Sequence, residues 1–187
     1  MNISYVIESI KYGPHLKNED EGIVKYLKGS HFDDDYEFTQ FNYSYGLTDD
    51  SKDKYLLKED DILLAAKGYR NFAWNYTTDV GPCIASSTFY VIKVKKLLVL
   101  PKYFTLLINS PKIQHKLRFL GLGPVTPSIP KNELLNIEID LPTIVDQEKA
   151  IKIYSSIRSQ IKIQRKILEQ KITLKKGLLD LLTEKHE

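Results

Sequence analysis

The amino-acid sequence predicts an α+β protein, with a mixed α/β domain over residues 1–143 and one long coiled-coil helix over residues 144–187. The first observation is that short β-type runs, helical periods and glycine- or proline-rich turns follow one another along the first part. The second is that the last part contains no proline and repeats its apolar residues at helical spacing. A hydrophobic content of 42% in 187 residues supports one core with an appendage.

Three strands are predicted in the N-terminal third of the chain. Runs of β-branched, aromatic and leucine residues at 3–7 and 23–27 are separated by a polar turn at 13–22. An acidic loop at 31–35 precedes the aromatic run 36–45. This run alternates in polarity, so we expect it to be the third strand.

Two apolar strands are predicted in the middle of the chain. Residues 62–66 form an apolar run after an acidic stretch, and residues 88–94 form a second β-type run. The segment 67–79 between them has the composition of an exposed loop or hairpin, although it contains four aromatic residues. We therefore expect two strands joined through an exposed segment.

A helix, a rigid loop and a strand are predicted next. Pro101 can open a helix at its first turn, so residues 102–120 are expected to be an amphipathic helix, interrupted at 109–111. Two glycines and three prolines in 121–130 predict an irregular loop. Residues 134–141 alternate in polarity as a strand does.

The C-terminal helix is expected to begin at a capping box formed by Thr143 and Asp146. At 1.5 Å per residue it is a rod of roughly 60 Å, longer than a domain of ordinary size can cover. Its apolar stripe therefore favours a partner helix from another chain, with a helix lying on its own domain as the alternative. Gly177 is a candidate bend before a separate last segment, 178–184. The expected partner-facing residues are Tyr154, Ile157, Ile161, Leu168, Ile172 and Leu179.

Composition and charge exclude several classes of protein. No apolar run approaches the ~20 residues of a membrane span, and the N-terminus lacks the pattern of a secretion signal. The single cysteine, Cys83, excludes an internal disulfide and suits a reducing cytoplasm. The charge balance is −6 over residues 1–60, +5 over 61–144 and +4 over 145–187. This basic excess is compatible with phosphate binding and also with an ordinary solvated surface.

An ordered set of segments, more than any single motif, carries a resemblance to a known family. The segments are 61–65 with 67–68, Ala85-Ser86 before a strand, 101–104 with 107–110, 121–130 leading through Leu134, Ile137 and Ile139 to 141–142 and 146–147, and 174–179. Together they resemble one half of the DNA specificity (S) subunit of type I restriction-modification systems. The likeness covers nearly the whole chain from residue 20 onward.

The resemblance implies a DNA-recognition subunit that is not itself an enzyme. Members of the family pair a mixed α/β target-recognition domain with a long spacer helix, and a full S subunit has two of each. This chain resembles a half-subunit that pairs antiparallel with its own copy through the helix. The implied partners are double-stranded DNA and a modification (methyltransferase) subunit, with or without a restriction subunit. S-adenosylmethionine is expected on that partner and no cofactor here. A symmetric pair reads an inverted, bipartite target.

Candidate DNA-reading side chains gather in the segment 67–76. Cationic side chains there can contact phosphate or guanine, amides have the geometry for adenine, and aromatic rings can stack on a displaced base. Two polar residues just before the acidic loop are further candidates for phosphate contact. The candidate residues are Lys67, Tyr69, Arg70, Asn71, Trp74, Asn75, Lys28 and Ser30. The alternative for the aromatic residues is a small local core under a surface loop.

No catalytic or metal site is predicted. The four histidines are scattered, one cysteine gives no zinc spacing, and no glycine-rich nucleotide-binding turn occurs. Two other functions remain as alternatives. One is a coiled-coil interaction module that binds no DNA. The other is a metal-dependent nuclease using Asp33 to Asp35 with Asp50 and Lys52, although no strand flanks them to hold such a site rigid.

Overall fold

The structure is a computed structural model, and it describes residues 1–16, 24–39, 54–120 and 127–184. Within it the chain divides into two units, Met1–Gln147 and Glu148–Glu187. None of the described helices is both long and apolar enough to cross a membrane. Parts of six predictions lie outside the described residues: 17–22 of the polar turn, Ile23 of the second strand, 40–45 of the third strand, 121–126 of the irregular loop, 185–187 of the long helix, and Asp50 with Lys52 of the nuclease alternative.

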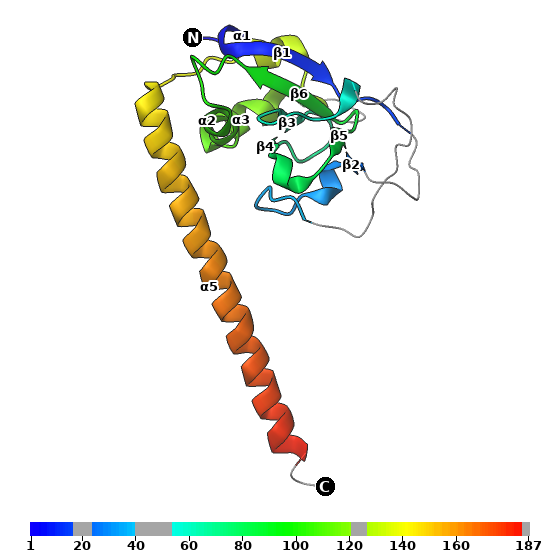
Figure 1. The fold of residues 1–187 in the computed structure, drawn as a ribbon, viewed down its shortest axis with the longest axis vertical. Helices are drawn as coiled ribbons and strands as arrows, with labels where there is room; N and C mark the ends of the chain where they lie inside the picture. Colours follow the sequence, from blue (N-terminus) through cyan, green and yellow to red (C-terminus); the bar gives the residue numbers. More distant parts are fainter. Residues whose placement is uncertain (17–23, 40–53, 121–126, 185–187) are drawn as a thin grey trace. The chain divides into compact units, whose positions relative to one another are not determined.

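The first unit is built on a four-stranded antiparallel sheet with the strand order β1-β6-β3-β4 (Figure 1). Its strands are β1 (Ile7–Tyr12), β3 (Ile62–Ala65), β4 (Ala73–Asn75) and β6 (Phe89–Val94). All four residues of β3 are buried, because this strand lies between β6 and β4. The strands predicted at 62–66 and 88–94 are confirmed, and the segment 67–79 forms the second half of a hairpin.

A second, two-stranded sheet pairs β2 (Lys25–Leu27) in parallel with β5 (Cys83–Ala85). Strand β2 confirms residues 25–27 of the strand predicted at 23–27. Strand β5 was not predicted, because three small or apolar residues are too few to show a period. Two short 3-10 turns, Gly29–His31 and Thr78–Val80, follow β2 and β4.

Helices α2 (Pro101–Ile108) and α3 (Pro111–Leu120) confirm the predicted helix and its interruption. Both bury apolar side chains in the main core, which they share with the sheet. The Asn109 side chain ends α2 beside the outer edge of β4. Its Oδ1 accepts from the Ala73 N–H and its Nδ2 donates to the Ala73 carbonyl, both at 2.8 Å. These bonds satisfy backbone groups that an edge strand leaves open.

Two of the predicted strands are wrong. Residues 3–7 mostly form the short helix α1 (Ile3–Val6), whose two buried residues are three apart, as one helical turn requires. Within 134–141, helix α4 (Lys131–Asn136) is followed by an extended stretch with an isolated bridge between Glu138 and Asn2. In both places the helix has only four to six residues, too few for a helical period to stand out from a β-type run.

The long helix α5 (Ile144–Glu184) begins in the first unit and forms the second. At its start the Thr143 hydroxyl accepts from the Asp146 N–H at 3.3 Å and donates to the Asp146 carboxylate at 2.7 Å, so the threonine caps the helix as predicted. The buried Gln147 side chain bonds the Leu98 carbonyl and the Leu100 N–H. The helix is continuous through Gly177, so residues 178–184 are not a separate segment.

The apolar stripe of α5 is exposed along the described part of the helix. Its six predicted partner-facing side chains have exposed fractions between 43% and 58%. Burying such side chains is favourable by about 1.5–3 kcal/mol each when it is complete. The helix therefore carries an apolar surface that another chain can cover.

Candidate nucleic-acid interface

The tip of the β3–β4 hairpin presents Lys67 and Tyr69 to solvent. Both side chains are exposed, and Tyr69 is 90% exposed. Gly68 between them has a φ of +105°, a conformation that favours glycine. Its N–H donates to the Pro127 carbonyl at 2.8 Å, and Lys67 forms a bridge with Ser128. The backbone of the tip is thus held by a neighbouring segment.

Tyr12, which sequence reasoning missed, supports the ammonium of Lys67. The Lys67 Nζ lies 4.8 Å from the centroid of the Tyr12 ring. The Tyr12 hydroxyl donates to the Tyr90 hydroxyl at 2.7 Å, which donates to the Ile129 carbonyl at 3.0 Å. Burial raises the pKa of Tyr90, which favours the protonated hydroxyl that donates to the Ile129 carbonyl. The pairing of Tyr12 with Tyr90 follows from the strand register, which the sequence does not display.

Arg70 joins the hairpin to the turn after β2. Its guanidinium donates to the Gly29 carbonyl at 3.3 Å and to the Phe32 carbonyl at 2.5 Å. It also forms an ion pair with Asp34 at 3.1 Å and lies over the Phe72 ring, 5.1 Å from its centroid. The side chain predicted to read DNA therefore has an internal role that brings Lys28 and Ser30 close to the hairpin.

The remaining hairpin candidates also make internal contacts. The Asn71 amide donates to the Ala65 carbonyl at 2.9 Å, and the Asn75 amide donates to the Asp61 carbonyl at 3.5 Å. Trp74 packs against Phe32, with ring centroids 5.3 Å apart. With Phe72, Tyr76 and Phe89, these rings form a second core cluster. This matches the local-core alternative for Phe72, Trp74 and Tyr76, whereas Tyr69 remains outside it.

An open hollow of about 460 Å³ lies beside the hairpin tip. The described residues that line it come from the ends of β1 and β2 and from the turn between β5 and β6: His15, Leu16, Tyr26, Lys28, Gly29, Ser86, Ser87 and Thr88. The Thr88 carbonyl accepts from the Lys67 N–H at 3.2 Å, so the hollow adjoins the tip directly. Ser30 is exposed in the turn that follows Lys28. The structure thus brings the two predicted groups of residues to one region.

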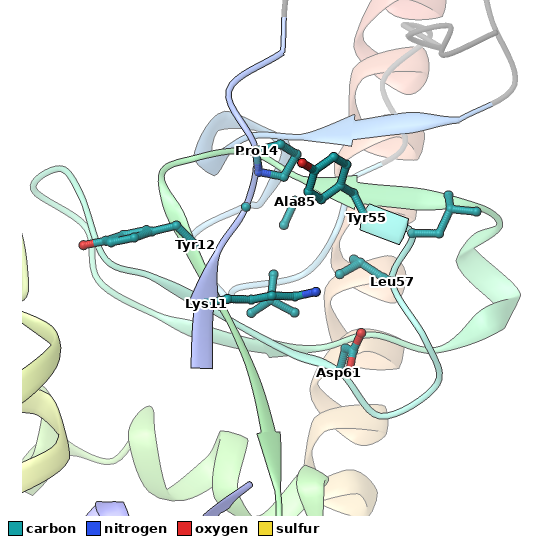
Figure 2. A pocket seen from close by; sticks show the side chains of 10 residues that line it. Lys11, Tyr12, Pro14, Tyr55, Leu57, Asp61 and Ala85 are labelled. Carbon is teal, nitrogen blue, oxygen red and sulfur yellow. The ribbon is translucent and has the colours of Figure 1, made fainter. Parts of the chain in front are cut away.

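The second pocket is a small internal space of about 10 Å³, enough for about one water molecule. Figure 2 shows Lys11, Leu57 and Asp61 around it, from three different segments. The buried Asp61 carboxylate accepts from the Lys58 N–H at 2.9 Å and lies 3.7 Å from the Lys93 ammonium. This carboxylate fixes the entry into β3, and the space is too small for a substrate.

Metal-binding geometry is absent from the described part of the chain. Within it, no group of three or more histidine, cysteine or acidic side chains is placed to hold a metal ion. Asp33 of the nuclease alternative accepts from the N–H groups of Asp35 and Glu37, at 3.0 and 2.8 Å, as in an ordinary turn. The partners proposed for it, Asp50 and Lys52, lie outside the described residues.

A mixed α+β domain with a long C-terminal helix is the architecture of type I restriction-modification specificity subunits, and solved structures share this fold. The chain matches the S subunit of the type I restriction-modification system from M. genitalium with a TM-score of 0.63 at 14% identity, over 87% of this chain and 39% of that one. It matches the HsdS subunit from Thermoanaerobacter tengcongensis with a TM-score of 0.64 at 16% identity, over 89% and 43%.

The family is established by the sequence match. The model of the type I restriction modification DNA specificity domain matches residues 9–173, and the chain belongs to this family. A structure concerned with complex assembly and conformational transition of the type I R-M system is also similar, with a TM-score of 0.63 at 16% identity, over 89% of this chain and 43% of that one. No curated protein matches the chain significantly. The chain spans about two fifths of the solved structures.

Proposed function

We propose that this chain recognises a specific double-stranded DNA sequence and directs a methyltransferase subunit to it. The family match over residues 9–173 supports this function. The observation that carries it is the hairpin tip, where exposed Lys67 and Tyr69 adjoin a hollow lined by Lys28. Cationic and aromatic side chains on a rigid tip suit contact with phosphates and bases.

The candidate residues divide into two roles in this proposal. Lys67, Lys28 and Ser30 contact phosphates, and Tyr69 contacts bases. Arg70, Asn71, Trp74 and Asn75 act indirectly, because their contacts hold the hairpin in shape. Phosphate contacts then supply most of the affinity, and the tip supplies sequence preference.

Selection from a random duplex pool at low salt tests this function. The unaltered chain is expected to enrich one sequence, and Tyr69→Ala to relax the preference while most of the affinity remains. Tyr5→Ala is the matched control, since Tyr5 is 57% exposed but belongs to α1. A pool that shows no enriched sequence with the unaltered chain refutes base reading by this chain alone.

The long helix supplies the second part of the proposal. Its exposed stripe of Tyr154, Ile157, Ile161, Leu168, Ile172 and Leu179 pairs antiparallel with a second copy, which makes the DNA target an inverted repeat. The modification subunit docks on the paired helices and holds S-adenosylmethionine, and the assembly acts in the cytoplasm. The similarity to a structure concerned with type I R-M complex assembly supports such a partnership.

A coiled-coil interaction module is the second candidate function, favoured by the same exposed stripe. The two functions differ in what the hairpin tip does. If the tip contacts DNA, Lys67→Glu abolishes DNA binding and leaves binding of the protein partner unchanged. If the chain is a module that binds no DNA, Lys67→Glu changes neither DNA binding nor partner binding.

A further inference from the structure

We propose that the hollow beside the hairpin tip is a subsite for one backbone phosphate of the DNA, separate from the base-reading tip. This inference rests on the proposed DNA-binding function and states where the duplex is anchored. The subsite consists of the Lys28 ammonium, the His15 imidazole and the hydroxyls of Ser86, Ser87 and Thr88.

The lining of the hollow has the chemistry that a phosphate requires. A phosphate diester accepts hydrogen bonds and carries a negative charge, so it needs donors and a cation. Among the described residues that line it are a lysine, a histidine, a tyrosine and three hydroxyl residues. These side chains bring hydrogen-bond donors and a positive charge to one place.

The walls of the hollow are held rigid by contacts among themselves. The Tyr26 hydroxyl donates to the Pro14 carbonyl at 2.7 Å and accepts from the Leu16 N–H at 3.2 Å, which fixes the first wall. The Ser86 N–H donates to the Leu27 carbonyl at 2.9 Å, which ties the second wall to the third. Donors held in place before binding lose little freedom when a ligand arrives.

Gly13 explains how the walls approach so closely. A Cβ at this position would lie 2.1 Å from the Ala85 carbonyl oxygen and 2.4 Å from that of Ser86. Both atoms belong to the backbone and cannot move aside cheaply. Only glycine lets the end of β1 pass against the turn that presents the hydroxyls.

The size and position of the hollow also suit one sugar-phosphate unit. Its volume of about 460 Å³ is open to solvent, so a strand can pass along it while the bases stay in the duplex. The Ser86 and Thr88 hydroxyls lie 2.7 Å apart and form a paired donor and acceptor on one wall. Since Thr88 is also bonded to Lys67, a strand anchored here runs beside the tip.

Salt titration with two variants tests the subsite. Lys28→Gln removes the cation, and Ser87→Asp adds a negative charge to the same hollow. Loss of one phosphate contact makes the slope of log affinity against log salt shallower by about 0.9. When salt rises from 50 to 200 mM, the affinity of the unaltered chain should therefore fall by a factor roughly threefold larger than the affinity of Lys28→Gln. Both variants should select the same sequence as the unaltered chain. Lys102→Gln, at an exposed lysine on α2, is the matched control and should leave the slope unchanged.

Duplexes that carry one neutral backbone linkage locate the phosphate that Lys28 contacts. Duplexes of the selected sequence carry one methylphosphonate at each backbone position in turn. At one backbone position the methylphosphonate should lower the affinity of the unaltered chain and leave the affinity of Lys28→Gln unchanged. Thermal melting should show that both proteins are folded. Equal sensitivity of the two proteins at every position overturns the subsite alone. Absence of any duplex binding by the unaltered chain overturns the proposed function itself.

Discussion

Tyr12 gives the hairpin tip a support that acts through another residue. Its ring lies under the Lys67 ammonium, and its hydroxyl is fixed by Tyr90. Tyr12→Leu should weaken DNA binding about two- to fivefold, because an exposed cation–π contact contributes ~0.5–1 kcal/mol. Tyr12→Phe keeps the ring and should keep the affinity. Fluorescence anisotropy measures both, and Tyr5→Leu, which removes the ring near Lys95, is the control expected to bind normally.

Cys83 should be chemically silent in the folded protein. Burial raises the pKa of its thiol from 9.0 to about 12, so almost no thiolate forms at pH 8. A thiol reagent such as Ellman's should react only after denaturant is added. Because the folded pKa is the higher one, the unfolded chain loses the proton first, and stability should fall as pH rises from about 9 to 12. Rapid reaction of the native protein contradicts this.

His31 should make the fold sensitive to mild acid. Burial, with the charge of Lys28 next, lowers the pKa of His31 below 6.5, and its Nδ1 accepts from the Lys28 N–H at 3.3 Å. The unfolded state therefore binds the proton more readily, and stability should be lost as pH falls below 6.5. Thermal melting at pH 7.5 and 5.5 measures the loss. His31→Ala should lower stability at pH 7.5 and show less difference between the two pH values; an equal difference would contradict the assignment to His31.

The candidate residues could be found from the sequence, but their roles could not. Composition placed attention on residues 67–76, and the tip does present Lys67 and Tyr69. Arg70 has the same chemistry as a DNA-reading arginine, and only the fold supplies its carbonyl partners, from a turn far away in the sequence. Tyr12 escaped notice for the same reason, since its role depends on the register of β1 against β6.

At the scale of elements, two glycines should respond oppositely to the same change. Gly177 lies inside α5, and a Cβ there meets nothing within 4 Å, so Gly177→Ala should stabilise the helix by about 1 kcal/mol. Gly68 has a φ of +105°, so Gly68→Ala should destabilise the domain by roughly 1–3 kcal/mol. Circular dichroism during thermal melting measures both. A rise in melting temperature for Gly68→Ala would show that the tip is not held in this conformation.

Element length decided which parts of the fold the sequence revealed. The apolar runs of β3 and β6 are long enough to be recognised as strands. The helical periods of α2, α3 and α5 are likewise long enough to be recognised. Helices α1 and α4 have four and six residues, too few to show a helical period. Their conformation is set by packing against one another and the core, which no local pattern records.

For the whole molecule, the stripe on α5 should control self-association. Ile161→Asp places a charge in the middle of the stripe and should abolish pairing, because an apolar seam does not accept an unpaired carboxylate. Gln170→Asp, on the opposite side of the helix at 3.6 residues per turn, is the control and should pair normally. Sedimentation should give twice 21.6 kDa for the unaltered chain and the control. A monomer of the unaltered chain contradicts the proposed pairing.

The hairpin tip is secured by two contacts from a neighbouring segment, the Gly68 bond to Pro127 and the Lys67 bridge to Ser128, and by the Asn71 bond to Ala65 within the hairpin. None of these three contacts involves the side chain of Lys67 or Tyr69. The side chains at positions 67 and 69 can therefore be exchanged without loss of the fold. A library randomised at these two positions, with Gly68 kept, should yield folded proteins that prefer other DNA targets.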